Sequence, residues 1–352
     1  MIIALYVIFF VSLLAPIYTY AIYPIILKLL PGRQYTVDNE YKPLVSVIIT
    51  NEQDNQLTEE KIISLKKLEY PDEKIEILIC SRGVSEDYGF KVIQYQNDNK
   101  AEAIDIMLKA AQGKVILITD LKTTLDSSVV NYLVRHFSNT RVGCVVGQSR
   151  NDFPSLFWKY ENFVRVQEGK IGRVSGANKA IYAIRNGIIN SIPSNIINVD
   201  FYISTLIQQN NFDVLFEKDA IAYEIAGEQA DHIREGAGNY QALSVFWRML
   251  FPGRGSFVFC SHRVMKWLVP FNLIAIFITD AVLSFDSLLM LVLFIMQVLF
   301  YIAVISYRFF IVKKNRKPIA IVIPIISLAY YFLTVNVALL IGWAKYISRK
   351  RS

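Results

Sequence analysis

The sequence is poor in residues that form disulfides or bind zinc, with only three cysteines and three histidines among 352 residues. Cys80, Cys144 and Cys260 lie far apart and form no C-x-x-C pair, so neither a disulfide framework nor a zinc finger is encoded. The histidines are equally scattered and supply no clustered metal site. These absences exclude a disulfide-stabilised secreted mini-protein and a zinc-folded domain.

Charge is also scarce, because 19% of the residues are Asp, Glu, Lys or Arg while 53% are hydrophobic. This composition, with a mean hydropathy of +0.34, excludes a disordered chain and is too apolar for an ordinary soluble protein. The net charge is +7. A basic excess is typical of nucleic-acid binding and also of Lys and Arg beside membrane spans. The apolar balance favours the membrane, and we expect no nucleic-acid partner.

The apolar residues are concentrated at the two ends of the chain. Residues 1–30 carry no charge before Lys28, which is long enough to cross a hydrocarbon core of about 30 Å. A secretory signal peptide would have a basic start and a shorter apolar stretch, so we interpret these residues as a retained transmembrane anchor. Residues 264–345 form a C-terminal membrane region with about three helices, predicted at residues 264–283, 288–312 and 319–343.

Basic residues predict how the chain crosses the membrane. Lys28, Arg33 and Lys42 follow the first span, and a basic cluster at residues 313–317 separates the last two. The positive-inside rule places both groups, and the middle of the chain, in the cytoplasm. Four spans would put the basic tail at residues 345–351 outside. Either one C-terminal segment lies in the interface or re-enters, or the tail is an exception; the sequence leaves this open.

The middle of the chain, residues 41–235, has the pattern of an α/β domain. Apolar β-rich runs at residues 44–50, 75–80 and 115–119 are separated by helical stretches at residues 58–68 and 99–111. This alternation predicts a Rossmann-like, mostly parallel sheet. Ligands of such sheets bind beyond the carboxyl ends of the strands.

An interfacial segment is predicted at residues 236–263. Its residues 240–255 are rich in aromatic and aliphatic side chains around a single Arg248, and Pro252 ends the run. A short helix of this composition is typical of the membrane interface. A core helix of the α/β domain is the alternative.

Several short motifs occur in a fixed order within residues 42–271. Together they resemble the membrane-bound family 2 glycosyltransferases, the group of cellulose-synthase-like and hyaluronan-synthase-like enzymes with a GT-A fold. The matching segments are residues 43–49 (PLVSVII), 70–71 (YP), 100–105 (KAEAID), 120–122 (DLK), 175–185 (SGANKAIYAIR), 199–201 (VDF), 236–243 (GAGNYQAL) and 261–270 (SHRVMKWLVP).

The resemblance implies an inverting sugar transfer from a nucleotide-sugar donor to a lipid-linked or envelope saccharide acceptor, at the plasma (inner) membrane, by a multi-pass protein with a cytoplasmic catalytic domain. Asp200 would be the catalytic base and Asp120 a ligand of Mg²⁺ or Mn²⁺ and of the nucleotide. The implied nucleotide-sugar contacts are Asp120, Lys122, Lys100, Asp54, Arg82 and Arg234, and the implied acceptor-side residues are Gly176, Ala177 and Asn178.

The chemistry explains these residue types. Transfer needs a base for the acceptor hydroxyl and positive charge for the departing diphosphate. An aspartate at a strand end can hold a divalent cation that bridges phosphates, and an arginine can bind phosphate with a bidentate fork.

The motifs also depart from the family pattern. Arg82 stands where the family has an acid, and Lys122 replaces the second acid of its D-x-D motif. The acid of the first loop aligns either with residues 51–52 or with residues 53–54. The sequence has no Q-x-x-R-W motif, which argues against a processive synthase. The alternative is a catalytically degenerate protein that serves as a membrane scaffold or partner of an active transferase.

Overall fold

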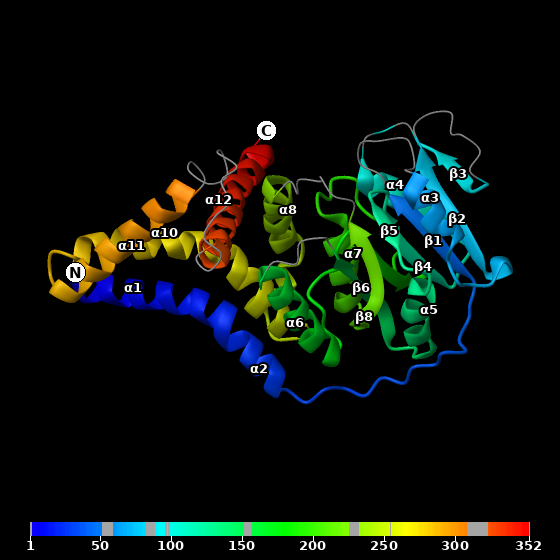
Figure 1. The fold of residues 1–352 in the computed structure, drawn as a ribbon, viewed down its shortest axis with the longest axis horizontal. Coiled ribbons are helices and arrows are strands. Elements are labelled where there is room, and N and C mark those ends of the chain that lie inside the picture. Colours follow the sequence, from blue (N-terminus) through cyan, green and yellow to red (C-terminus); the bar gives the residue numbers. More distant parts are fainter. Residues whose placement is uncertain are drawn as a thin grey trace.

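The computed structural model describes residues 2–50, 59–81, 89–95, 97, 99–150, 156–224, 232–253, 255–307 and 323–351. An α/β domain lies at one end of the molecule, and long helices from both ends of the chain extend away from it (Figure 1). The predicted nucleotide contacts Asp54 and Arg82 lie outside the described residues, as do both alignments of the first-loop acid.

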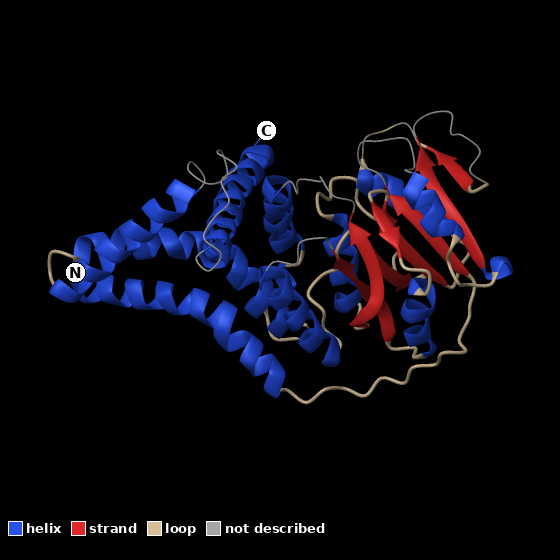
Figure 2. Ribbon diagram, viewed as in Figure 1, coloured by secondary structure: helices blue, strands red, loops and turns tan. Residues whose placement is uncertain are grey.

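One eight-stranded sheet forms the centre of the α/β domain, in the order β3-β2-β1-β4-β7-β6-β8-β5 (Figure 2). The strands are β1 (Val45–Thr50), β2 (Ile75–Ser81), β3 (Lys91–Gln94), β4 (Val115–Asp120), β5 (Thr123–Leu125), β6 (Val142–Arg150), β7 (Ile181–Arg185) and β8 (Asp213–Glu224).

The sheet has a parallel half and a mixed half. Strands β3, β2, β1 and β4 are all parallel, as the alternation of strands and helices predicts. Beyond β4 the sheet is mixed, since β7 runs antiparallel to both β4 and β6, and β5 runs antiparallel to β8. Strands β6 and β8 are parallel to each other and run in the same direction as β4, so six of the eight strands share one direction. The expected mostly parallel sheet is therefore confirmed, with β7 and β5 as the exceptions. The short β5 reverses direction directly after β4, with no helix between them.

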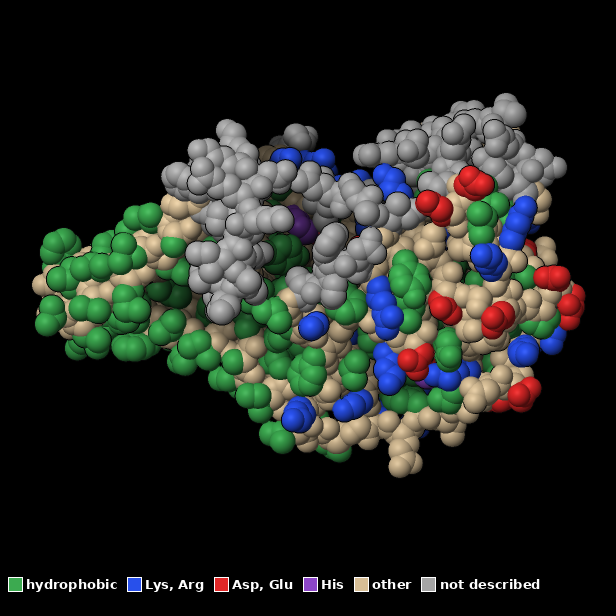
Figure 3. All heavy atoms as spheres, viewed as in Figure 1, with side chains coloured by type: hydrophobic (Ala, Val, Ile, Leu, Met, Phe, Trp, Pro, Cys, Tyr) green, Lys and Arg blue, Asp and Glu red, His purple; other side chains and the backbone are tan. Residues whose placement is uncertain are grey.

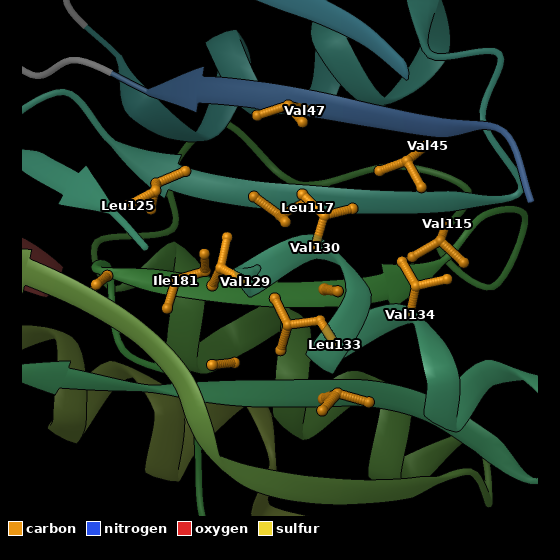
Figure 4. Close-up of a cluster of buried hydrophobic side chains, with 14 of the residues drawn as sticks. Val45, Val47, Val115, Leu117, Leu125, Val129, Val130, Leu133, Val134 and Ile181 are labelled. Atoms are coloured by element: carbon orange, nitrogen blue, oxygen red, sulfur yellow. The ribbon is translucent and has the colours of Figure 1, made fainter. Parts of the chain in front are cut away.

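Helices cover both faces of this sheet. The helices are α3 (Glu59–Lys66), α4 (Lys100–Ala110), α5 (Val129–Val134), α6 (Leu156–Lys170) and α7 (Val199–Gln209). On one face, Val129 and Leu133 of α5 pack against Val47 and Leu117 of the sheet (Figure 4). The opposite face is covered by α4 and α7. Burying each such aliphatic side chain contributes about 1.5–3 kcal/mol.

Four helices are long and apolar enough to cross a membrane. The first long helix consists of α1 (Ile2–Ile17), η1 (Tyr18–Ile22) and α2 (Tyr23–Leu29). The second consists of α9 (Ser256–Val258), η5 (Phe259–Val264) and α10 (Met265–Leu283). The third and fourth are α11 (Leu288–Tyr307) and α12 (Ile323–Arg351). Phe9 of α1 packs with Ile276 and Leu283 of α10. Hydrophobic side chains cover the end of the molecule that these helices form (Figure 3).

The last helix returns to the α/β domain, where it packs along α8 (His232–Val245). A Cβ atom on Gly342 would lie 2.6 Å from the Ala237 nitrogen, so the two helices meet backbone to backbone. The hydroxyls of Ser244 and Tyr346 form a hydrogen bond of 2.7 Å. The C-terminus therefore lies beside α8 (Figure 1), and the expected domain limit at residue 235 falls within this helix.

Candidate active site

Asp200, the predicted base, lies in the first turn of α7 with both carboxylate oxygens hydrogen-bonded. Oδ2 is 2.8 Å from Nζ of Lys100, and Oδ1 accepts a hydrogen bond of 3.0 Å from the hydroxyl of Tyr182. Because an ionised carboxylate has about four acceptor sites, it can still accept a substrate proton.

Lys100 is held by the start of α4. The side chain of Asn99 caps this helix by accepting hydrogen bonds from the backbone nitrogens of Ala101 and Glu102. This cap fixes the helix start and directs Lys100 to Asp200. Both residues are buried, and pairing compensates the cost of removing each charge from water. The structure thus brings together two residues that lie 100 positions apart.

Tyr182 is a site residue that the sequence analysis did not single out. It lies on β7, fully buried, and burial together with the Asp200 carboxylate raises its pKa well above the usual range. The phenol therefore stays protonated and acts as a hydrogen-bond donor to Asp200. A signal was present, because Tyr182 lies four residues after Asn178 within the segment that resembles the acceptor-side motif.

The predicted acceptor-side residues adjoin α7. Gly176 has a φ of +100°, and a Cβ atom there would lie 2.4 Å from the ring of Phe201. The backbone nitrogen of Ala177 donates a hydrogen bond of 2.8 Å to Oγ of Ser204. Oδ1 of Asn178 accepts hydrogen bonds from two backbone nitrogens that follow it. The loop is thus packed against the helix that carries Asp200.

Asp120 is nearly buried at the carboxyl end of β4, where a ligand of a parallel sheet is expected. Its Oδ1 accepts a hydrogen bond of 3.0 Å from the backbone nitrogen of Lys122. In the register of the sheet, Asp120 pairs with Thr50, so the ends of β1 and β4 meet at one edge. Lys122 lies in the turn to β5 and is partly exposed.

A second lysine, which the sequence analysis missed, lies beneath this turn. Lys61 of α3 is fully buried, and its Nζ is 3.0 Å from Oγ1 of Thr119 and 3.2 Å from Oγ1 of Thr123. Burial lowers the pKa of Lys61 to about 7, and the Asp120 carboxylate acts in the opposite direction. Its helical spacing with Leu65, four residues later and also buried, was the available signal.

The Mg²⁺ or Mn²⁺ implied by the resemblance does not fit the described part of this site. These cations take several oxygen ligands, mostly carboxylates and carbonyls. Across the described ranges, no group of three or more His, Cys, Asp or Glu side chains could hold a metal ion. Oδ1 of Asp120 instead accepts the hydrogen bond from the backbone nitrogen of Lys122, and the Asp120 charge acts on the buried Lys61.

A buried polar network lies on the side of the acceptor loop toward the long helices. Oε1 of Glu168 accepts a hydrogen bond of 2.8 Å from Tyr23 and lies 2.7 Å from Nδ1 of His262. Oε2 of Glu168 accepts a hydrogen bond from the Ser175 nitrogen. Burial alone would raise the pKa of Glu168, but His262, Ser175 and Arg263 outweigh this effect and lower it. The network links the loop to the first and second long helices.

Arg234, the predicted contact of the leaving group, lies exposed in the first turn of α8. It follows residues that are not described. Its role stays a prediction from the resemblance.

Neither a protein-family model nor a curated protein sequence matches the chain. Among solved structures, a mannosyltransferase from Pyrobaculum calidifontis in complex with GDP-Man and Mn²⁺ is similar with a TM-score of 0.75 and 17% identity, over 99% of both chains. TarS of S. aureus in complex with UDP-GlcNAc covers 66% of this chain and 72% of its own, with a TM-score of 0.47 and 13% identity. The chain has a GT-A-like α/β fold. The match to the mannosyltransferase includes the long helices as well as the domain.

Proposed function

We propose that this protein is a membrane-bound, inverting glycosyltransferase that transfers a sugar from a nucleotide-sugar donor to a lipid-linked or envelope saccharide acceptor. The observation that carries the proposal is the environment of Asp200. A buried carboxylate at a helix N-terminus is held by Lys100 and Tyr182 beside a loop of acceptor-motif sequence. Such an arrangement suits a general base whose position is fixed before the substrates bind.

In the proposed reaction, the Asp200 carboxylate accepts the proton of the acceptor hydroxyl. The acceptor oxygen forms a bond to the anomeric carbon from the side opposite the donor's diphosphate. The bond between that carbon and the diphosphate oxygen breaks, and the electron pair leaves with the nucleoside diphosphate. Tyr182 keeps its own proton and orients the carboxylate, because it donates a hydrogen bond throughout. The donor would bind at the edge of the sheet where Asp120 and Lys122 lie.

The acceptor would reach Asp200 from the side of the long helices. The loop at residues 176–178 lies between α7 and the network of Glu168 and His262, which includes residues of two candidate spans. A lipid-linked acceptor would therefore enter from the membrane. The lack of a Q-x-x-R-W motif supports transfer of single sugars rather than polymer extension.

The proposed location is the plasma (inner) membrane, with the α/β domain in the cytoplasm. Four long apolar helices support a membrane protein, and the basic residues after the first of them support this orientation. The domains proposed are an anchor at residues 1–30, a catalytic domain at 41–235, an interfacial segment at 236–263 and a membrane region at 264–345.

A degenerate transferase that serves as scaffold or partner of an active enzyme is the second candidate. Lys122 in place of an acid favours it, because this change removes a ligand on which the family's metal depends. The two candidates differ in donor binding. A scaffold should bind no nucleotide sugar, whereas a transferase should bind one.

A donor screen on the purified full-length protein in detergent tests the proposal. Thermal shift with uridine- and guanosine-diphosphate sugars, with and without Mg²⁺ or Mn²⁺, should show stabilisation by one of them. Binding at 100 times the dissociation constant would add about 2.7 kcal/mol to the folded state. If no donor changes the unfolding temperature under any condition, the scaffold candidate replaces the transferase.

A further inference from the structure

The turn from β4 to β5 is built around a buried lysine. Lys61 enters from α3 with its Nζ between the hydroxyls of Thr119 and Thr123, which bracket Asp120 and Lys122. Oγ1 of Thr119 also donates to the carbonyl oxygen of Ala180, two residues after the acceptor loop. Lys61 therefore supports the donor edge and its link to the acceptor side.

A lysine is rarely buried without a charge that opposes it, because moving an ammonium from water into the interior is unfavourable. Among the described residues, Asp120 supplies an opposing charge, which raises the pKa of Lys61 whereas burial lowers it. The carboxylate that the family uses for a metal thus already interacts with a cation of the chain itself.

The charges around the turn consequently favour an anion. In a D-x-D turn, two carboxylates attract a divalent cation. The described part of this turn carries one carboxylate, that of Asp120, with Lys122 in the position of the second acid and the buried Lys61 nearby. A lysine in that position repels a divalent cation and attracts a diphosphate. Lysine binds phosphate as a compact point charge, which does not require the planar geometry of an arginine.

We infer that Lys122 neutralises the donor's diphosphate in place of a divalent cation, while Lys61 holds the turn that carries Lys122. Donor binding is therefore independent of metal. Lys122 contacts the diphosphate, and Lys61 is a positioning residue that holds the turn and adds its charge. This inference rests on the proposed function. It distinguishes the protein from the mannosyltransferase of similar fold, whose structure contains Mn²⁺ with GDP-Man.

Calorimetric titration of the full-length protein in detergent tests the inference, with GDP and UDP as probes in excess EDTA or in excess Mn²⁺. For the wild type we expect the dissociation constant of the preferred nucleotide to differ by less than about threefold between the two conditions. Lys122→Asp should weaken binding about tenfold or more in EDTA and recover with Mn²⁺, since it restores a second acid. Lys114→Asp, exposed before the opposite end of β4, is the matched control and should bind like the wild type.

Lys61→Met should weaken nucleotide binding severalfold in both conditions, while Lys66→Met, on the exposed side of the same helix, should not. If Lys61→Met does not fold, Lys61→Gln replaces it in the comparison, because its amide group can still form hydrogen bonds with Thr119 and Thr123. Equal affinities in the wild type and the Lys61 variant would remove Lys61 from the site.

The outcomes separate this inference from the proposed function. Wild-type binding that requires Mn²⁺ overturns the inference and leaves a metal-dependent transferase. Binding of neither nucleotide in either condition overturns both. Binding that is equal in EDTA and Mn²⁺, and that becomes dependent on Mn²⁺ in Lys122→Asp, supports both.

Discussion

Nζ of Lys100 lies 2.8 Å from Oδ2 of Asp200, and both side chains are buried. The candidate base is therefore one half of a buried ion pair and not an isolated carboxylate. Removing one member of such a pair leaves the other charge buried alone, which costs about 3–5 kcal/mol. A substitution at Asp200 therefore affects both the proton-accepting group and the stability of the fold.

Asp200→Asn should reduce sugar transfer by a factor on the order of 10² or more, because asparagine cannot accept a proton. It should also lower the unfolding temperature, since Lys100 loses its counter-charge. In the double variant with Lys100→Gln, the unfolding temperature should recover while transfer stays low. Transfer near the wild-type rate in Asp200→Asn would exclude Asp200 as the base.

Tyr182→Phe should have a smaller effect on transfer than Asp200→Asn. It removes one hydrogen bond to a carboxylate, worth about 1.5–3 kcal/mol, and leaves the proton acceptor in place. Rates and unfolding temperatures of the two variants, measured side by side, check this order. A Tyr182→Phe enzyme as inactive as Asp200→Asn would mean that the phenol takes part in the proton transfer itself.

The difference in unfolding free energy between Lys61→Met and the wild type should be more favourable to the variant near pH 7 than near pH 10. The pKa of Lys61 is lowered from 10.5 to about 7 in the folded state, so between these values the unfolded chain binds a proton that the folded chain releases. The stability of the wild type therefore rises with pH through this window, and the advantage of the variant shrinks. Thermal unfolding at both pH values measures the difference. Lys66→Met, exposed on the same helix, should show a difference that does not change with pH.

Gly176→Ala should destabilise the protein more than Gly187→Ala. Both glycines have positive φ, +100° and +82°, so both variants strain the backbone. Only at Gly176 would the new Cβ collide with the ring of Phe201, whereas no atom lies within 4 Å at Gly187. Overpacking adds about 1–3 kcal/mol. Unfolding temperatures provide the comparison, and equal losses would show that Phe201 moves aside freely.

The side of the membrane on which the tail lies can also be tested. Because α12 packs along α8, we expect the tail and the α/β domain to share the cytoplasm, which requires that one of the three C-terminal candidate helices does not cross the membrane. On a cysteine-free background, Asn97→Cys and Ser348→Cys should both resist an impermeant reagent in intact cells and react after permeabilisation. Labelling of Asn97→Cys in intact cells would show that the α/β domain faces the outside. Labelling of Ser348→Cys alone would show that only the tail lies outside.

The sequence predicted the local parts of the fold well. The parallel strands β1, β2 and β4 and the helices between them follow from hydrophobic patterns, with limits that differ by one or two residues. The antiparallel insertion of β7 between β4 and β6 depends on pairing between distant segments, which no local pattern encodes. The same holds for α12, whose contact with α8 depends on two distant glycines, Gly236 and Gly342.

The site was predicted by residue type rather than by arrangement. Asp200 and Lys100 each came from a motif, and the structure shows that they bind each other. Tyr182 and Lys61 were missed, because a tyrosine in a strand and a lysine in a helix are usually structural or solvated. Their burial depends on the packing of the sheet and becomes apparent only in three dimensions.

The contact of α8 with α12 has a consequence for biosynthesis. The face of α8 that carries Gly236 is synthesised before its partner helix, so it stays uncovered until residues 323–351 have been made. All eight strands of the sheet precede α12 in the chain, so the sheet can form first, whereas the packing of α8 is completed only once α12 is present.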